Sequence, residues 1–315
     1  MVDDTVYDVV MIGAGPSALS AAVYTAREDL KTLIIEKAVV GGMAAITDQI
    51  DNYPGFANGV PGMELADQLQ KQAERFGAHF EYGTATQLAR ENNDIRVTTD
   101  AGEFTARAVL IATGSDYSKI NVPGEAEYYG RGVHYCATCD GAFYRDKKLA
   151  VVGGGNSGIQ ETIFLTRFAS HIDLLVRSTI KASSVLQKEL QTHIDSGKVT
   201  VHLGTTISEI KATEGKVSSV DIMTNGAPGT LTVDGVFVFV GLKPNTQFLQ
   251  GSDVRLDSLG LIVTDETYHT SMPGVFASGD VRSGATMQVA SAVGEGASAA
   301  LAIRHYIENA DRAAA

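Results

Sequence analysis

The sequence has no tryptophan, only two cysteines, and a deficit of positive charge. Its 25 lysine and arginine residues stand against 37 acidic residues, which gives a formal net charge of −12. Nucleic-acid phosphates and anionic membrane surfaces both attract lysine and arginine, so this balance argues against either partner. Long apolar runs are also lacking, because Gly, Pro and Asp interrupt the apolar start of the chain. We therefore expect no nucleic-acid partner and no membrane partner.

Both cysteines lie in one short stretch, YCATCDG, at residues 135–141. Two cysteines without an export signal indicate a reducing, cytoplasmic compartment, where C-x-x-C is more often catalytic than structural. An inert buried pair is one alternative. Another is part of a zinc site with His134 as a further ligand, although such sites normally need four ligands.

The polar residues around this motif have purely structural interpretations as well. Asp140 follows the second cysteine and either exchanges protons with it or caps a turn. We expect His134 to be a structural or partly exposed residue. The neighbouring tyrosines, which we expect to serve packing, are Tyr128, Tyr129, Tyr135 and Tyr144.

Two stretches of the chain repeat one pattern of apolar strand, glycine turn and helix. Each turn matches G-x-G-x-x-[GA], with Gly13, Gly15 and Ala18 in the first copy and Gly153, Gly155 and Gly158 in the second. The first glycine permits a tight turn, the second lets the backbone approach a pyrophosphate, and the small third residue lets helix and strand pack. The helix N-terminus then supplies N–H donors for the phosphates. The sequence therefore predicts two dinucleotide sites.

The next strand of each repeat separates the two sites. The first ends at Glu36, whose carboxylate suits the hydroxyls of an unmodified ribose, as in FAD or NAD. The corresponding residue of the second is Val176, followed by Arg177 and Lys181, which together suit a 2′-phosphate. The first site is thus predicted to hold FAD, and the second favours NADP. The alternative for Arg177 and Lys181 is a solvated basic pair.

The apolar pattern predicts an α/β fold with two Rossmann-like, three-layer ββα dinucleotide-binding domains, the second inserted into the first. The segment after residue 245 is too short for a domain of its own, so we expect it to return to the first. The predicted FAD domain comprises residues 1–116 and 246–315. The predicted NAD(P)H domain comprises residues 117–245 and carries the cysteines. A long helix is expected over residues 286–308.

Almost the whole chain resembles the low-molecular-weight thioredoxin reductases, class II FAD-dependent pyridine nucleotide-disulfide oxidoreductases. The motifs that carry this resemblance are GAGPSA with Glu36, DNYPGF, IATGS, YCATCDG, VVGGGNSG, FVGLKPN and TSMPGVFASGDV, in the family's order and spacing. Unrelated Rossmann proteins share only the glycine motifs, so the resemblance is specific.

The resemblance implies that Cys136 and Cys139 form a redox-active disulfide and that Asp140 is the proton donor or acceptor beside them. The residues that it and the glycine motifs assign to FAD are Gly13, Gly15, Pro16, Ser17, Ala18, Glu36, Lys37, Gly42, Asn52, Thr113, Gly114, Gly279, Asp280, Gln288 and Val289. Those assigned to NADPH or NADH are Gly153, Gly155, Asn156, Ser157, Gly158, Arg177 and Lys181. No metal site is expected.

The sequence departs from the family pattern in three places. Met43 stands where the family has Gln after the glycine pair, and Met287–Gln288–Val289 stands where it has Arg-Gln-Ala. In the 2′-phosphate signature Arg177 is present, but Ser178 replaces the second arginine and Lys181 takes the place of the last. Lysine is a point charge without the bidentate fork of arginine, so NADPH, NADH and another donor all stay open.

The family implies a thioredoxin-disulfide reductase that passes a hydride from NAD(P)H to FAD and then reduces Cys136–Cys139. With no third cysteine for an internal relay, the acceptor must reach this pair directly, which favours thioredoxin or a similar small dithiol protein. Nicotinamide and disulfide must both reach one flavin, so we expect the inserted domain to rotate about crossings near residues 114–120 and 243–245. A homodimer is also implied.

Other functions fit parts of this pattern. A dithiol oxidase would use the same flavin and cysteines in reverse, but GGGNSG is intact. The flavoprotein subunit of alkyl hydroperoxide reductase carries an additional N-terminal dithiol domain, and a ferredoxin–NADP reductase lacks C-x-x-C. A non-catalytic flavin redox sensor is the alternative outside the enzymes.

Overall fold

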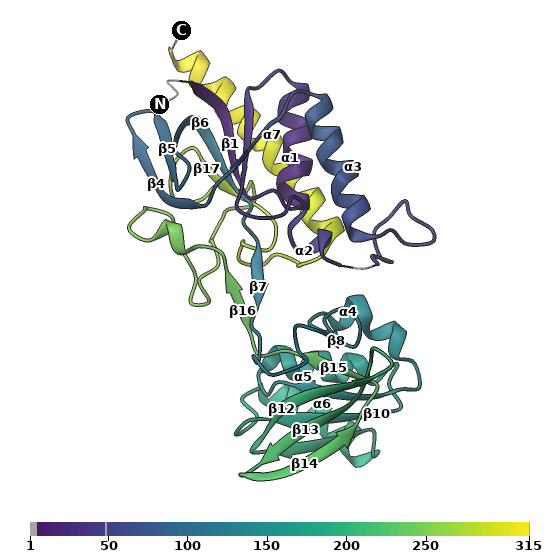
Figure 1. Cartoon of the computed structure of the whole chain (residues 1–315). Helices are drawn as coiled ribbons and strands as arrows, with labels where there is room; N and C mark the ends of the chain where they lie inside the picture. The colour runs from purple at the N-terminus through teal and green to yellow at the C-terminus, as the bar shows by residue number, and fades with distance from the viewer. Residues whose placement is uncertain (1–4, 48, 315) are drawn as a thin grey trace. The chain divides into compact units, whose positions relative to one another are not determined.

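The computed structural model describes residues 5–47 and 49–314 and divides into two compact units, one inserted in the other (Figure 1). The first unit comprises Met1–Asp116 and Lys243–Ala315, and the second comprises Tyr117–Leu242. The sequence predicts a return crossing near residues 243–245 with the first domain resuming at 246, and the first unit resumes at Lys243. The reason is that Asn245 is already bonded to Thr113 and Gly114 of that unit.

The first unit is built on a seven-stranded sheet in the order β3–β2–β1–β6–β5–β4, with β17 paired to β6. Its strands are β1 (Val6–Ile12), β2 (Thr32–Glu36), β3 (His79–Tyr82), β4 (Ala85–Glu91), β5 (Asp94–Thr99), β6 (Glu103–Ile111) and β17 (Val275–Ala277). β1 pairs in parallel with β2 and β6, and β2 pairs in parallel with β3. β4 and β5 form an antiparallel extension.

Strand β6 changes partner along its length. Its first half pairs with β5, where Ala106 faces Ile95, and its last residues, Val109–Ile111, pair in parallel with β17. Because β17 comes from the far end of the chain, the C-terminal segment completes the sheet that the N-terminal segment begins. The prediction of one domain inserted into the other is confirmed.

Helices of the first unit pack beside its sheet. They are α1 (Pro16–Arg27), α2 (Gly42–Ala45), α3 (Gly62–Arg75) and α7 (Val289–Ala314), with the 3₁₀ turn η2 (Gln247–Leu249). Figure 1 shows α1 between α3 and α7, and α1 contacts both. The contact with α7 is close, because a Cβ at Gly296 would lie 2.0 Å from the Ser17 carbonyl oxygen. Only glycine fits there.

The second unit repeats the arrangement of the first. Its parallel sheet has the order β11–β10–β9–β15–β8, which matches β3–β2–β1–β6 over four strands. The strands are β8 (Val133–His134), β9 (Lys148–Val152), β10 (His171–Val176), β11 (Val199–Leu203) and β15 (Gly235–Val238), and the antiparallel β12 (Thr205–Thr213), β13 (Lys216–Thr224) and β14 (Ala227–Thr232). The helices are α4 (Ala137–Asp140), η1 (Gly141–Tyr144), α5 (Asn156–Leu165) and α6 (Ser184–Asp195). This repeat confirms the predicted pair of Rossmann-like folds.

Two short strands carry the chain between the units. They are β7 (Ser115–Tyr117) and β16 (Leu242–Pro244), which pair in a two-stranded sheet. On the side of the first unit, the Thr113 hydroxyl donates to the Asn245 carbonyl oxygen at 2.8 Å, and the Asn245 amide donates to the Thr113 carbonyl oxygen at 3.1 Å. The outgoing and returning segments are therefore bonded to each other and form one two-stranded ribbon.

The long C-terminal helix differs from its predicted bounds of 286–308. It begins at Val289 and continues to Ala314. Met287 has a φ of +57°, a left-handed conformation that cannot be part of a right-handed helix, so the helix starts after it.

Candidate active site

The two cysteines of YCATCDG are joined in a disulfide. Cys136 is the N-cap of α4 and Cys139 lies within it, and the Cys139 N–H is 3.2 Å from the Cys136 sulfur. A single helical turn therefore brings the two sulfurs together, since residues i and i+3 share one face. The pairing implied by the family resemblance is present in the structure.

Asp140 is not isolated beside this disulfide. Its Oδ2 lies 3.3 Å from Nδ1 of His134, and Nε2 of the same imidazole lies 2.7 Å from the Tyr144 hydroxyl. His134 is only 6% exposed and stacks on Phe237, with ring centroids 5.1 Å apart. Burial raises the pKa of the Tyr144 hydroxyl well above its ordinary value, and the charges of Asp140 and Asp234 raise it further. The phenol therefore keeps its proton.

The first glycine loop joins β1 to α1. Gly13 has a φ of +96°, and a Cβ there would lie 2.6 Å from the Ala112 carbonyl oxygen, so only glycine fits. Gly15 has nothing within 4 Å of the position of a Cβ, and a Cβ at Gly42 would lie 3.7 Å from the Gly15 Cα. Pro16 opens α1 at a position whose N–H would have no helical partner in any case. The loop is thus open at Gly15, where a phosphate would need to approach.

Glu36 is fixed at the end of β2. It is 8% exposed, and its carboxylate accepts from the Ala14 N–H at 2.7 Å and from the Ala38 N–H at 2.8 Å. A carboxylate has about four acceptor positions, so roughly two are left for ribose hydroxyls. Lys37 is the next residue and is exposed.

A second loop lies against the start of α1. Gly279, with a φ of +73°, approaches Ser17, whose hydroxyl is 2.6 Å from that of Ser278. Ser17 and Ala18 are both buried, so they hold this junction together from within. Asp280 follows Gly279, and no hydrogen bond to its carboxylate is found among the described residues.

The Asp280 carboxylate has lost much of its solvent. This loss, together with the nearby charge of Glu295, raises the pKa of Asp280 to about 6. Glu295 itself is satisfied, because it accepts from the Gly279 N–H at 2.8 Å and pairs with Arg282 at 2.7 Å. Asp280 is therefore a desolvated acceptor that lacks donors, which fits the hydroxyls of a bound ligand.

The remaining residues assigned to FAD lie in three places. Gln288 and Val289 stand at the start of α7, and the Asn52 amide donates to the Gln288 side-chain oxygen at 3.0 Å. The Thr113 hydroxyl donates to the Asn245 carbonyl oxygen. Gly114, with a φ of +65°, follows Thr113 at the crossing.

The second glycine loop joins β9 to α5. Gly153 is in the positive-φ region, and Gly158 packs on it, because a Cβ at Gly158 would lie 2.7 Å from the Gly153 carbonyl oxygen. Gly155 is open, like Gly15 in the first loop. A Cβ at Gly154 would lie 2.6 Å from Val176, which explains why this loop reads Gly-Gly-Gly where the first has Gly-Ala-Gly. Val176 fills the position that Glu36 has in the first site.

Polar groups of the second site come from the segment after β10. The Lys181 N–H donates to the Gly154 carbonyl oxygen at 2.7 Å, and the Asn156 side chain accepts from the Ser183 N–H at 2.8 Å. These bonds tie the segment to the glycine loop. Arg177 and Lys181 are exposed, and no ion pair of either is found among the described residues. Ser157 is exposed in the first turn of α5.

The residues fit the two dinucleotides that the sequence predicts. Each glycine loop leaves its second glycine open, and each is followed by a helix whose first N–H groups lack helical partners. The first adds two carboxylates, Glu36 and Asp280, which suit hydroxyl donors. The second adds Arg177 and Lys181, exposed cations that form no ion pair with the residues described, and these suit a phosphate.

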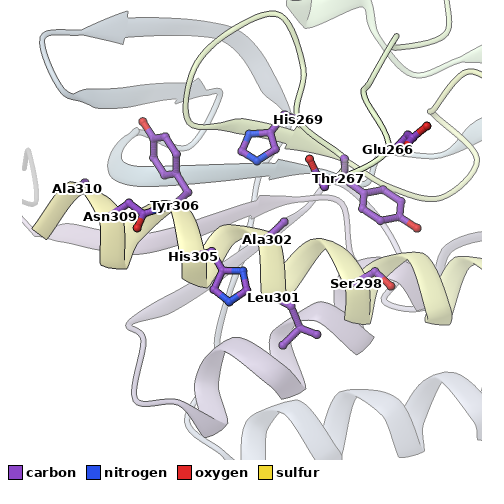
Figure 2. A pocket seen from close by; sticks show the side chains of 11 residues that line it. Glu266, Thr267, His269, Ser298, Leu301, Ala302, His305, Tyr306, Asn309 and Ala310 are labelled. Atoms are coloured by element: carbon purple, nitrogen blue, oxygen red, sulfur yellow. The ribbon is translucent and has the colours of Figure 1, made fainter. Parts of the chain in front are cut away.

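A separate cavity of about 530 Å³ lies in the first unit between α7 and the loop at residues 266–269. Figure 2 shows His269, His305 and Tyr306 around it, and none of the predicted site residues lines it.

In residues 5–47 and 49–314 no cluster of three or more potential metal ligands is present. None of the helices in this described part is both long and apolar enough to span a membrane.

Sequence reasoning missed His134 and Tyr144 as partners of Asp140. His134 ends a two-residue strand, Asp140 ends α4 and Tyr144 ends η1, so no periodicity relates the three. Glu295 was missed as well, because it reaches the Gly279 loop from α7. Such pairings depend on how separate elements pack, and a single sequence carries no direct signal of them.

Comparison with known proteins gives one consistent family. Residues 7–296 match the family described as pyridine nucleotide-disulphide oxidoreductase. The Bacillus subtilis thioredoxin reductase is 40% identical over 311 residues, 98% of this chain and 97% of the relative. The thioredoxin reductase structure from Streptococcus pyogenes is 38% identical with a TM-score of 0.92, covering 98% of this chain and all of that one.

A second solved structure is about as similar to this chain in sequence but superposes on it less well. The Lactococcus lactis thioredoxin reductase in its "FR conformation" is 36% identical and covers 96% of this chain and 99% of its own, but has a TM-score of 0.65. The predicted resemblance is confirmed. The chain belongs to the pyridine nucleotide-disulphide oxidoreductase family and, within it, to the thioredoxin reductases.

Proposed function

We propose that this protein reduces the disulfide of thioredoxin, or of a similar small dithiol protein, with electrons from NAD(P)H passed through FAD. The observation that carries the proposal is the Cys136–Cys139 disulfide beside Asp140, in a chain that also has two open glycine loops. A nicotinamide delivers two electrons as hydride, and FAD when bound supplies the step between hydride and disulfide chemistry.

Each of the two sites has a distinct binding role in this proposal. In the first, the open backbone at Gly15 receives the pyrophosphate of FAD, Glu36 accepts from ribose, and Asp280 accepts from ribityl hydroxyls. In the second, Gly155 receives the nicotinamide dinucleotide. These assignments make Met1–Asp116 with Lys243–Ala315 the FAD domain and Tyr117–Leu242 the NAD(P)H domain.

The chemistry at the cysteines needs two electrons and two protons. Reduction breaks the S–S bond and yields two thiols, and Asp140 exchanges one of the protons. In the return reaction a thiolate of the pair attacks the disulfide of the partner, a mixed disulfide forms, and the second cysteine resolves it. Since no third cysteine exists in the chain, the partner must approach Cys136 or Cys139 itself.

The first experiment is an anaerobic titration of the purified flavoprotein with NADPH and, separately, with NADH. Flavin bleaching at low NADPH, followed by reduction of thioredoxin, would support the proposal. Cys136→Ser and Cys139→Ser should then keep flavin bleaching but lose thioredoxin reduction. Absence of bleaching by either nucleotide would overturn the proposed donor and leave a dithiol oxidase, or another donor, as the better interpretation.

We propose NADPH as the preferred donor, because Arg177 and Lys181 are exposed cations on a segment tied to the second glycine loop. Arg177→Ala with Lys181→Ala should raise the apparent NADPH dissociation constant about tenfold to a hundredfold and leave NADH unchanged. Lys188→Ala is a matched control, since Lys188 is an exposed cation on α6 of the same unit. An equal loss with NADH would show that the two cations do not read the 2′-phosphate.

We also propose that the NAD(P)H domain rotates about the β7–β16 ribbon between half-reactions. Two reductases about equally similar to this chain, from S. pyogenes and L. lactis, give TM-scores of 0.92 and 0.65, so those two structures differ from each other in arrangement. A cytoplasmic location and a homodimer belong to the same proposal. Sedimentation of the purified protein tests the dimer.

A further inference from the structure

Three side chains beside the disulfide form one connected line. The Tyr144 hydroxyl is 2.7 Å from Nε2 of His134, and Nδ1 of His134 is 3.3 Å from Oδ2 of Asp140. The line joins three elements of the second unit, since His134 ends β8, Asp140 ends α4 and Tyr144 ends η1. The Asp140 carboxylate thus contacts an imidazole that is itself anchored in the body of the same unit.

The packing fixes the imidazole in place. His134 is 6% exposed, stacks on Phe237 at 5.1 Å, and meets the Tyr144 ring edge-on at 5.3 Å. Tyr144 is held in turn against the backbone of β15, because a Cβ at Gly235 would lie 2.4 Å from its ring. A ring confined on these sides cannot flip freely, so each nitrogen keeps its own partner.

The protons of the line can be assigned from its chemistry. The phenol of Tyr144 keeps its proton, and among the described residues its one hydrogen-bond partner is Nε2 of His134. If Nε2 carried a hydrogen, the tyrosine proton would have no acceptor there. Tyr144 therefore donates to Nε2, which places the imidazole proton on Nδ1, facing the Asp140 carboxylate.

We propose that His134 is a positioning residue for Asp140, which it holds through an Nδ1–H that faces Oδ2 across their 3.3 Å contact, and that Tyr144 sets the tautomer of His134 for this task. The proposal deepens the proposed disulfide reductase function and rests on it for its kinetic part. Oδ2 is occupied by His134, so Oδ1 of the carboxylate is directed to the proton that it exchanges.

This arrangement serves a proton transfer that is coupled to disulfide exchange. With the cysteine pair reduced, one thiol gives its proton to Oδ1 of Asp140 and becomes a thiolate. That thiolate forms a new S–S bond with the partner, whose own S–S bond breaks and whose second sulfur leaves with the electron pair. A carboxylate that is not held in place would populate several orientations, and proton transfer to it would be slower.

The first test reads the tautomer directly and does not depend on activity. Long-range ¹H–¹⁵N spectra of ¹⁵N-histidine-labelled holoenzyme, assigned with His134→Asn, should show His134 protonated on Nδ1 and bare on Nε2. Tyr144→Phe should replace this by a mixture of tautomers. A proton on Nε2 in the wild-type protein would overturn the proposal, whether or not the protein reduces thioredoxin.

The second test measures the rate at which the reduced cysteine pair attacks an aromatic disulfide reagent, and then thioredoxin, in stopped flow. His134→Leu should lower this rate about tenfold to a hundredfold, less than the full effect of a general acid–base group. His134→Asn should recover most of it, because the asparagine amide can donate to Oδ2. His79→Leu is the matched control, since His79 is exposed on β3.

The double variant separates positioning from a structural role. In an Asp140→Asn background, His134→Leu should have no further effect on the rate, because the two residues act as one unit. An equal further loss in that background would overturn the proposal. Flavin absorbance and thermal melting check that each variant is folded. Should His134→Leu fail to fold, Tyr144→Phe and His134→Asn still give the tautomer and the rate.

Discussion

The fold desolvates the Asp280 carboxylate, and no hydrogen-bond donor to this carboxylate is found in the described part of the chain. Loss of solvent and the charge of Glu295 raise its pKa from 3.8 to about 6. The ionised form is therefore unfavourable in the folded apoprotein, while hydroxyls of a bound flavin would supply the missing donors. Residues that bind ligands commonly destabilise the free protein in this way.

We predict that Asp280→Asn stabilises the flavin-free protein above pH 6. Below about pH 4 Asp280 is protonated in both the folded and the unfolded state, so it does not lower the free energy of unfolding. Between about pH 4 and pH 6 only the unfolded state releases the proton, so the free energy of unfolding falls as the pH rises. Above pH 6 the loss is complete, at about 3 kcal/mol.

Melting temperatures of the two apoproteins across pH 4–8 check this prediction. The advantage of the variant should be largest at pH 7–8 and shrink toward pH 4. FAD affinity should change in the opposite direction and become weaker in the variant. A stability difference that does not vary with pH would mean that Asp280 does not titrate as described.

At the scale of elements, the two glycine loops are alike in backbone, and the strands that come after them differ. In each loop the first glycine of the motif has no room for a side chain and the second faces open space, Gly13 and Gly15 in the first loop and Gly153 and Gly155 in the second. The strand after each loop then ends in Glu36 or in Val176. In the proposed function the loops would bind the phosphates, and the strand ends would distinguish the two ligands.

We predict that Gly15→Ala folds normally but binds FAD more weakly. The backbone at Gly15 has φ −71° and ψ 174°, which alanine adopts readily, and its Cβ would meet nothing within 4 Å. Apoprotein stability should change by less than about 0.5 kcal/mol. A methyl group against a pyrophosphate should weaken FAD binding about tenfold to a hundredfold, measured by flavin fluorescence. Gly13→Ala is the contrasting control, since its clash with Ala112 should impair folding itself.

The matching change in the second loop has a different expected result. Gly155→Ala, with φ −87° and ψ 180° and open space around it, should keep its yellow flavin but need at least about tenfold more NADPH for bleaching. The physical reason is the same methyl group against a different pyrophosphate. A colourless Gly155→Ala protein beside a yellow Gly15→Ala protein would reverse the two cofactor assignments.

At the scale of the whole molecule, the first unit is assembled from both ends of the chain. Its cores contain Met11 and Leu110 from the first segment together with Phe276 and Ile303 from the last. The chain leaves the first unit through β7 and returns through β16. These two strands pair, so the points where the second unit is inserted lie about 5 Å apart. The inserted unit has separate cores, which include Leu175 and Val236 in one and Leu149 and Phe237 in the other.

We predict that the first unit folds without the second. A variant in which a short glycine-rich linker replaces Tyr117–Leu242 should unfold cooperatively, bind FAD and be yellow, yet neither NADPH nor NADH should bleach it. Absorbance spectra and thermal melting measure both properties. An insoluble or colourless product would show that the flavin site depends on residues of the inserted unit.

Much of this protein could be predicted from its sequence, because the informative signals are local. Glycine spacing, the apolar strands before each loop and the identity of residue 36 follow from backbone sterics and hydrogen-bonding chemistry within about 25 residues of chain. The C-x-x-C pair is local too, since one helical turn brings its sulfurs together. The fold class, the insertion and the family were therefore accessible.

Only the tertiary structure determined the contacts between elements that are distant in sequence or related by no period. The pairing of β17 with β6, the contact of Glu295 with Gly279, and the line from Tyr144 through His134 to Asp140 all belong to this class. Their geometry depends on how helices and strands pack around a shared core, and no spacing rule of a single chain encodes it. Local motifs thus specify which chemistry the protein carries, and packing fixes which side chains hold that chemistry in place.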